Sequence, residues 1–130
     1  MKEVIILFAM IFCHIADDFY LQGIMKEMKQ KAWWREQTDK ELYRNDYIVV
    51  LFLHAFSWTC MIHVPVILPM VLSGEYINPA WPLLIFAINW TIHTVVDNEK
   101  ANKLSINLVA DQMIHIAQVV LTWIVYTMIL

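Results

Sequence analysis

Histidine and aspartate residues recur inside the most apolar segments of this chain of 130 residues. Three segments each hold one histidine and one aspartate four residues apart: His14 and Asp18, His93 and Asp97, Asp111 and His115. Residues four apart lie on one face of an α-helix, about one turn from each other. A further apolar segment carries His54 alone. The fold must therefore turn these faces away from an apolar environment, because an ionisable side chain in hydrocarbon costs roughly 2.5–3.5 kcal/mol on insertion scales.

The composition indicates a membrane protein. Hydrophobic residues make up 60% of the chain and charged residues only 16%, whereas about a quarter of the residues of a soluble domain are charged. Four apolar segments have about the length that a bilayer crossing requires: 4–22, 47–72, 81–96 and 104–130. We expect an all-α integral membrane four-helix bundle that forms one transmembrane domain over residues 1–130.

The segment between the first two spans carries two further signals. Hydrophobic residues alternate with lysines at near-helical spacing from Ile24 to Trp34, which predicts a short helix in the inner headgroup layer; an ordinary charged loop is the alternative. Thr38 and Glu41 fit a capping box that would begin the helix of the second span. Pro65 and Pro69 should kink the far half of that span.

The distribution of basic residues predicts the orientation. The loop from 23 to 46 holds six of the nine lysines and arginines, and the loop from 98 to 105 holds two more. The loop from 73 to 80 holds none. Because short cytoplasmic loops are enriched in basic residues, the protein is expected in the inner (plasma) membrane with both termini outside the cytoplasm.

This topology brings the polar residues to similar depths. At about 1.5 Å per residue, His14 and Asp18 lie about 15 and 21 Å below the outer end of their span. His54 lies about 10 Å above the inner end of its span. The pair on the third span lies about 18 and 24 Å below its outer end, and the pair on the fourth about 10 and 16 Å above its inner end. All seven groups fall near the midplane or on the cytoplasmic side of a core of about 30 Å.

Four imidazoles and three carboxylates at one depth predict a metal site. The proposed ligands are His14, Asp18, His54, His93, Asp97, Asp111 and His115. Imidazole and carboxylate together suit a divalent ion, with zinc first and manganese or iron as alternatives. They could hold one ion with an outer shell, or two ions bridged by an aspartate. We expect Gln22, Asn89 and Gln112 in the outer shell, because such groups orient metal ligands.

A bound divalent ion would support hydrolysis. It lowers the pKa of a coordinated water toward about 7 and polarises a carbonyl or phosphoryl oxygen. Asp18, Asp111 and Lys100 are the candidate catalytic residues, with an aspartate as general base and Lys100 holding a carboxylate or an anionic substrate. At this depth the expected partner is a membrane lipid, and its ester or phosphoester is the expected substrate.

Two nearby polar residues are expected outside the site. His63 is nine residues from His54 and projects from nearly the opposite helix face. Asp17 points about 100° away from Asp18, which predicts a position at the membrane interface and a lesser role than Asp18.

The ordered motifs also resemble a known family. His14 and Asp18 followed by Phe19, Leu21 and Gln22, then His54, His93, Asp97, Lys100 and finally Asp111, Gln112 and His115, resemble the small bacterial and phage membrane proteins grouped as domain of unknown function 3307. The resemblance covers nearly the whole chain and implies a small helical membrane protein with polar motifs in its spans. It implies no activity, because that family has none assigned.

Two other functions compete with the hydrolase. The polar residues could relay protons or ions through a transport or pore module. They could instead form a structural polar core in a phage-linked or defence-linked membrane effector that assembles into a homo-oligomer. The sequence shows no nucleotide-binding loop, nucleophile elbow or basic nucleic-acid patch, so no nucleic-acid partner is expected.

Overall fold

The protein is built of helices along its whole described length, which in this computed structural model is residues 1–74 and 78–129. The first half contains α1 (Lys2–Ile15), the π-helical turn η1 (Ala16–Leu21), the short helices α2 (Met25–Met28) and α3 (Lys31–Gln37), and the 3-10 turn η2 (Glu41–Tyr43). The second half contains α4 (Asp46–Ser73), α5 (Ala80–Asn98), the π-helical turn η3 (Glu99–Lys103) and α6 (Leu108–Ile129). The predicted all-α class is confirmed.

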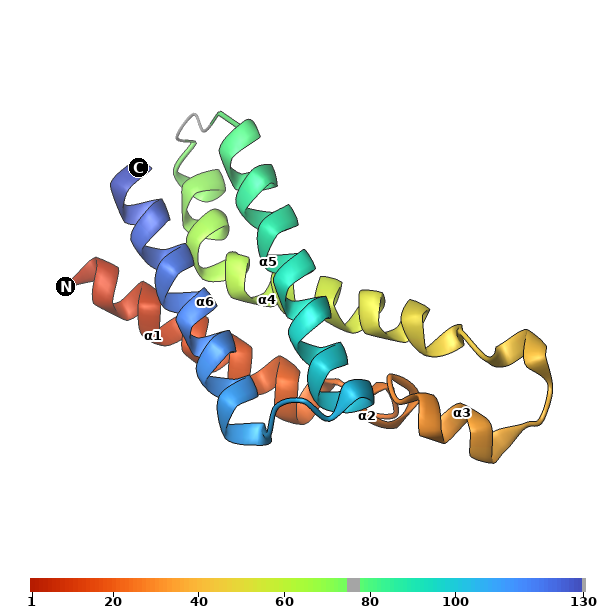
Figure 1. Ribbon diagram of the computed structural model, residues 1–130. Coiled ribbons are helices and arrows are strands. Elements are labelled where there is room, and N and C mark those ends of the chain that lie inside the picture. The colour runs from red at the N-terminus through yellow and green to blue at the C-terminus, as the bar shows by residue number, and fades with distance from the viewer. Residues whose placement is uncertain (75–77, 130) are drawn as a thin grey trace.

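The four long helices pack side by side. α4 contacts α1 and α5, and α6 contacts the same two helices. Both termini lie toward the end of the bundle where α4 finishes and α5 starts, whereas α2, α3 and η3 lie at the opposite end (Figure 1). The basic segments predicted to share one side of a membrane therefore do share one end of the bundle.

Within residues 1–74 and 78–129, three helical stretches are long and apolar enough to cross a membrane. They are Lys2–Leu21, Glu41–Ser73 and Leu108–Met128. α5 has 19 residues but is less apolar, since it carries Asn89, His93 and Asp97 on one face. Membrane localisation is compatible with this architecture, while a crossing by α5, and hence a four-span bundle, stays a prediction.

The distribution of side chains is the reverse of that in a soluble domain. Among the described residues, fifteen polar or charged side chains are buried against twelve hydrophobic ones. Large apolar side chains such as Phe8, Phe12, Leu53 and Val109 point outward. Monomeric soluble proteins rarely expose such extended apolar surface. Lipid is the environment that this exterior suits.

The interior is divided into an apolar half and a polar half. One hydrophobic cluster fills the end near the termini and includes Met10, Trp58, Ile62, Val119 and Tyr126. Apart from His63, the buried histidines and aspartates come from positions closer to the opposite end of each helix. The core that holds the helices together thus lies beside the polar residues.

α4 bends along its length, as predicted from its prolines. Pro65 and Pro69 lie inside the helix, and Figure 1 shows its first and second halves running in different directions. A proline lacks the N–H that bonds the carbonyl four residues earlier, and its ring crowds that carbonyl. The bend directs the second half of α4 along α5.

The start of the fourth long helix was predicted too early. α6 begins at Leu108 instead of residue 104, because Leu104 adopts a left-handed conformation with φ 55° at the end of η3. The side chain of Asn107 then accepts a hydrogen bond of 2.9 Å from the backbone N–H of Ala110, which caps the helix start. Residue 130, the predicted end of this span, lies outside the described residues.

The segment between α1 and α4 also differs from its prediction. The single helix expected over 24–34 is divided into α2 and α3, because Gln30 is extended. The capping box is wrong: Thr38 accepts from the backbone N–H of Lys40 instead of Glu41, and α4 begins only at Asp46. Asn102 clamps the division between α2 and α3 by accepting from the Lys31 N–H (2.7 Å) and donating to the Lys29 carbonyl (3.1 Å).

Asn102→Ala should release the α2–α3 segment without unfolding the long helices. The substitution removes both hydrogen bonds to the segment, each worth about 0.5–1.5 kcal/mol, together with a third one to Asn98, and it leaves the packing of the bundle intact. Hydrogen–deuterium exchange should become faster at residues 24–37 and stay unchanged in α4 and α6. Uniform protection in both proteins would show that other contacts hold the segment in place.

Candidate metal centre

Eight buried histidine and aspartate side chains meet where the four long helices face one another. This His/Asp cluster consists of His14, Asp17, Asp18, His54, His93, Asp97, Asp111 and His115, none more than 6% exposed. It includes all seven residues predicted from the sequence. Helical spacing explains the convergence, because each pair four residues apart presents both side chains on one face.

The imidazole of His54 is the centre of the first part of the cluster. Its Nε2 lies 3.3 Å from His93 Nε2 and 3.3 Å from Asp18 Oδ1. The same atom is 3.4 Å from Asp97 Oδ2. Ligand atoms about 2.0–2.1 Å from a tetrahedral zinc ion are themselves about 3.3 Å apart. The spacing of these nitrogen and oxygen atoms therefore fits a shared cation.

His115 occupies the second part of the cluster. Its Nε2 lies 3.3 Å from Asp97 Oδ1 and 3.4 Å from Asp111 Oδ1. Asp97 thus turns one oxygen toward His54 and the other toward His115. A carboxylate with this orientation can bridge two neighbouring positions.

Three sets of ligand atoms are close enough to hold an ion. Within each set the atoms lie within 4.8 Å of one another. The sets are Asp18, His54 and His93; His93, Asp97 and His115; and Asp18, Asp111 and His115. His93 Nε2 can bind only one ion, so the first two sets exclude each other. Three protein ligands leave a coordination position open, as in catalytic zinc sites.

Amide side chains orient the cluster from outside. Gln118 donates to the backbone and side-chain oxygens of Asn89, both at 3.2 Å, so its own Oε1 is left to accept from His115 Nδ1 at 3.1 Å. This places a proton on His115 Nδ1, while its Nε2 faces the carboxylates of Asp97 and Asp111. Asn89 therefore acts through Gln118, although it was expected to support His93.

Asp18 is held from both sides, as the sequence predicted. Gln112 donates to its Oδ2 at 2.7 Å and Gln22 to its Oδ1 at 3.3 Å. Gln112 also donates to Asp111 Oδ2 at 3.0 Å. The two candidate catalytic aspartates are thus linked through one amide.

His14 joins the cluster but belongs to none of the three ligand sets. Trp58 donates from Nε1 to His14 Nδ1 at 2.8 Å. Because the indole N–H only donates, Nδ1 carries no proton and a neutral His14 keeps its proton on Nε2. The Trp58 N–H therefore occupies the ring nitrogen of His14 that a neutral imidazole could otherwise offer to an ion. Sequence patterns do not distinguish Trp58 from the other aromatic residues of the spans.

Asp17 was expected at the membrane interface, and this is wrong. Its side chain is 1% exposed, accepts from Ser57 Oγ at 2.7 Å and lies 3.8 Å from His54 Nδ1. The π-helical turn η1 is the reason, since its wider spacing turns both Asp17 and Asp18 inward. His63 does lie apart: it bonds the Thr59 carbonyl and packs against Tyr126.

Two lysines neutralise part of the cluster's charge. Lys100 pairs with Asp111 at 2.7 Å, as its position seven residues after His93 suggested. Lys29 pairs with Asp97 at 2.6 Å and is itself buried. In the sequence Lys29 is one of six basic residues of a loop, and nothing in its spacing indicates a partner on α5.

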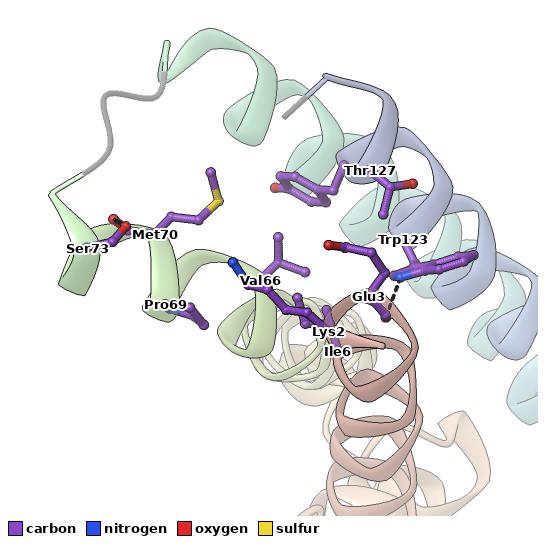
Figure 2. A pocket seen from close by; sticks show the side chains of 10 residues that line it. Lys2, Glu3, Ile6, Val66, Pro69, Met70, Ser73, Trp123 and Thr127 are labelled. Carbon is purple, nitrogen blue, oxygen red and sulfur yellow. Dashed lines mark hydrogen bonds between the residues drawn. The ribbon is translucent and has the colours of Figure 1, made fainter.

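A cavity reaches the cluster. This hollow of about 240 Å³ at the α2 and η3 end has Asp97, Lys29 and Lys100 among its lining residues. A second cavity of about 240 Å³ lies at the other end, between α1, α4 and α6 (Figure 2). Its lining includes Glu3 and Trp123 but no member of the His/Asp cluster. The hollow therefore approaches the cluster from the end that carries the basic residues.

Comparison with known proteins adds nothing to this geometry. No family model, curated protein or solved structure matches the chain. The resemblance to domain of unknown function 3307 stays a prediction, and the site must be interpreted from its own residues.

The pair of Lys29 and Asp97 provides a test of the cluster's electrostatics. Lys29→Met should lower the free energy of unfolding by about 3–5 kcal/mol, because it leaves a buried carboxylate without its closest cation. The double substitution with Asp97→Asn should recover most of that loss. Unfolding in detergent with a chelator present measures both; equal stability of the single and double variants would show that the pair is not coupled.

Proposed function

We propose that the His/Asp cluster binds one divalent metal ion through His54, His93 and Asp18, and that the protein is a metal-dependent hydrolase of the membrane. Zinc is the first choice, with manganese or iron as alternatives, because the set combines two imidazoles with one carboxylate. The observation that carries the proposal is that His54 Nε2 lies 3.3 Å from both His93 Nε2 and Asp18 Oδ1, while the ligand atoms of all three residues lie within 4.8 Å of one another.

The charge of the cluster supports a single ion. Four buried carboxylates, Asp17, Asp18, Asp97 and Asp111, face two ammonium groups, those of Lys29 and Lys100. If the carboxylates are ionised and the histidines neutral, two negative charges remain. An uncompensated buried charge costs several kcal/mol, and one divalent cation cancels this excess. Two divalent ions would instead leave the cluster with an excess of positive charge.

Unpaired atoms support the same reading. Asp111 Oδ1 and Asp17 Oδ2 are buried without a hydrogen-bond partner, as is Nδ1 of His54. Buried polar groups are usually paired, and such exceptions concentrate where a ligand or ion is bound. A fully satisfied structural core would not leave these atoms bare.

The surrounding residues suit hydrolysis once an ion is bound. The ion would supply a water of lowered pKa and polarise the bond to be cleaved. Asp111 keeps Oδ1 free while Lys100 and Gln112 hold its Oδ2, so it is oriented to accept a proton as general base. Asp18 acts as a metal ligand in this scheme, and Lys100 as the group that positions Asp111.

The proposed orientation follows from charge and exterior together. The four long helices span the inner membrane with both termini outside the cytoplasm, and the hollow that reaches the cluster opens at the cytoplasmic leaflet. The apolar exterior and the grouping of basic residues at one end support this arrangement. A lipid-like ester is then within reach of the site.

Metal analysis of purified protein tests the proposal. The wild type should carry about one divalent ion per chain, and His54→Ala, His93→Ala and Asp18→Asn should each lose it, because loss of one ligand in three leaves too few for stable binding. Elemental analysis by mass spectrometry gives the stoichiometry and identifies the ion.

His63→Ala is the matched control, since His63 is a buried histidine on the same helix as His54 but lies outside the cluster. It should keep the ion. A wild type without bound ion after metal supplementation, or equal metal content in the His54 and His63 variants, would rule the metal centre out.

A second candidate function is proton transfer across the bundle. α6 carries a buried polar stripe over its whole length: Asp111, His115, Gln118, Thr122 and Tyr126. Asn89 links two of its members by donating to Thr122 Oγ1 at 2.7 Å and accepting from Gln118. Such a stripe is longer than a metal centre alone requires.

Thr122→Val distinguishes this candidate from the hydrolase. It interrupts the stripe between Gln118 and Tyr126 while conserving the side-chain volume. If the stripe conducts protons, the proton flux should fall at least about tenfold. Proton uptake into liposomes measures the flux, and Thr94→Val, an exchange outside the stripe, is the control. Absence of flux from the wild type under an applied potential would exclude the path.

A further inference from the structure

The hollow beside the His/Asp cluster is rich in lysine. Gln22, Lys26, Lys29, Asp97, Lys100 and Leu104 are among its lining residues, and we refer to it as the lysine hollow. Lys26 is exposed, whereas Lys29 is 7% exposed. Three ammonium groups around a space of about 240 Å³ favour a ligand with negative charge.

Metal binding would strengthen this preference. In the structure Lys29 and Lys100 are directed to Asp97 and Asp111, two carboxylates of the cluster. Each ammonium group has three N–H donors, so Lys29 and Lys100 can donate to an anion in the hollow while they stay paired with these carboxylates. A divalent ion bound in the cluster would add further positive charge on that side of the hollow.

Gln22 requires that a ligand in the lysine hollow also carry a hydrogen-bond donor. It is 8% exposed and donates from Nε2 to Asp18, which fixes the orientation of its amide. Its Oε1 is buried and accepts no hydrogen bond from the protein. A ligand that fits the lysine hollow should therefore carry a hydroxyl or another donor besides its negative charge.

Leu104 gives the hollow an apolar lip. This leucine is 81% exposed and adopts φ 55°, a conformation that bulky residues rarely adopt. An apolar side chain at the mouth of a charged hollow suits a ligand whose head is anionic and whose remainder is hydrocarbon.

We propose that the lysine hollow binds the phosphodiester headgroup of an anionic, hydroxyl-bearing lipid of the phosphoglycerol type, with the acyl chains passing over Leu104. The phosphate accepts from Lys26, Lys29 and Lys100, and a glycerol hydroxyl donates to Gln22 Oε1. The inference rests on the proposed function, since it names the substrate class of that metal centre. The same headgroup chemistry occurs in free glycerol phosphate.

Binding measurements on the full-length protein in detergent test this assignment. Short-chain phosphatidylglycerol should bind about tenfold more tightly than phosphatidylcholine of the same chain length, because the net charge and the hydroxyl are lost in the latter. Lys26→Ala and Gln22→Ala should each weaken phosphatidylglycerol binding several-fold. Added zinc should raise the affinity of the wild type.

Lys103→Ala is the matched control. Lys103 lies three residues from Lys100 but donates to Glu99, and this bond together with one from Ser105 lowers the pKa of Glu99. Lys103 is not among the residues that line the lysine hollow, so the Lys103→Ala substitution should leave lipid binding unchanged. Equal binding of the two lipids, or equal losses in the Lys26 and Lys103 variants, would overturn the assignment.

Further results of these measurements distinguish a lipid headgroup from a free phosphate ester as the ligand. They also distinguish failure of the metal centre from failure of the lysine hollow. Glycerol 1-phosphate that competes as well as the lipid would assign the headgroup site to a free ester, and failure to compete would assign it to the lipid. Metal binding without any lipid preference overturns the lysine hollow and leaves the metal centre. Lipid preference through Lys26 without bound metal overturns the metal centre and leaves the lysine hollow.

Discussion

The rest of the structure depends on the contacts that the buried carboxylate of Asp97 makes with cations and hydrogen-bond donors. This carboxylate is 2% exposed and lies 2.6 Å from Lys29, 3.3 Å from His115 and 3.4 Å from His54. Lys29 directly follows α2, whereas His115 lies on α6 and His54 on α4. A charge removed from water costs several kcal/mol unless cations or donors surround it. No single helix could supply them, so the charge on α5 is stable only when the other elements converge on it.

Trp58 joins this polar half to the apolar half of the interior. Its ring is fully buried in the hydrophobic cluster and stacks on His93 with centroids 4.2 Å apart. Its Nε1 donates to His14. One side chain thus positions an imidazole from α5 and another from α1 while it fills the core. The precision of the cluster therefore derives from packing as much as from hydrogen bonds, as a site on rigid helices requires.

Helical periodicity made the all-α class and seven members of the cluster predictable from the sequence, since residues four apart must share a face. The remaining features depend on events that periodicity does not describe. The π-helical turn η1 changes the angle between Asp17 and Asp18. Leu104 delays the start of α6. Lys29 pairs with Asp97, which lies 68 residues further along the chain. Trp58 positions His14 through a single hydrogen bond from its indole nitrogen. A sequence pattern records which faces are polar, but it does not record which side chains from different helices meet.

The distribution of unpaired atoms distinguishes a binding site from a purely structural polar core. Hydrogen bonds between membrane helices contribute only about 0.6 kcal/mol each on average, so polar residues kept for packing should at least be paired. Around the cluster the outer amides are well matched: Gln112, Gln118 and Asn89 all bond neighbours. Four of the seven buried side-chain atoms without a partner among the described residues are ligand-type atoms of the cluster, on Asp17, His54, His93 and Asp111. The other three belong to Gln22, His63 and Tyr126. An ordered shell around a partly unsatisfied centre is the arrangement that a bound cation completes. The lysines approach the carboxylates from the side of the hollow that reaches Asp97.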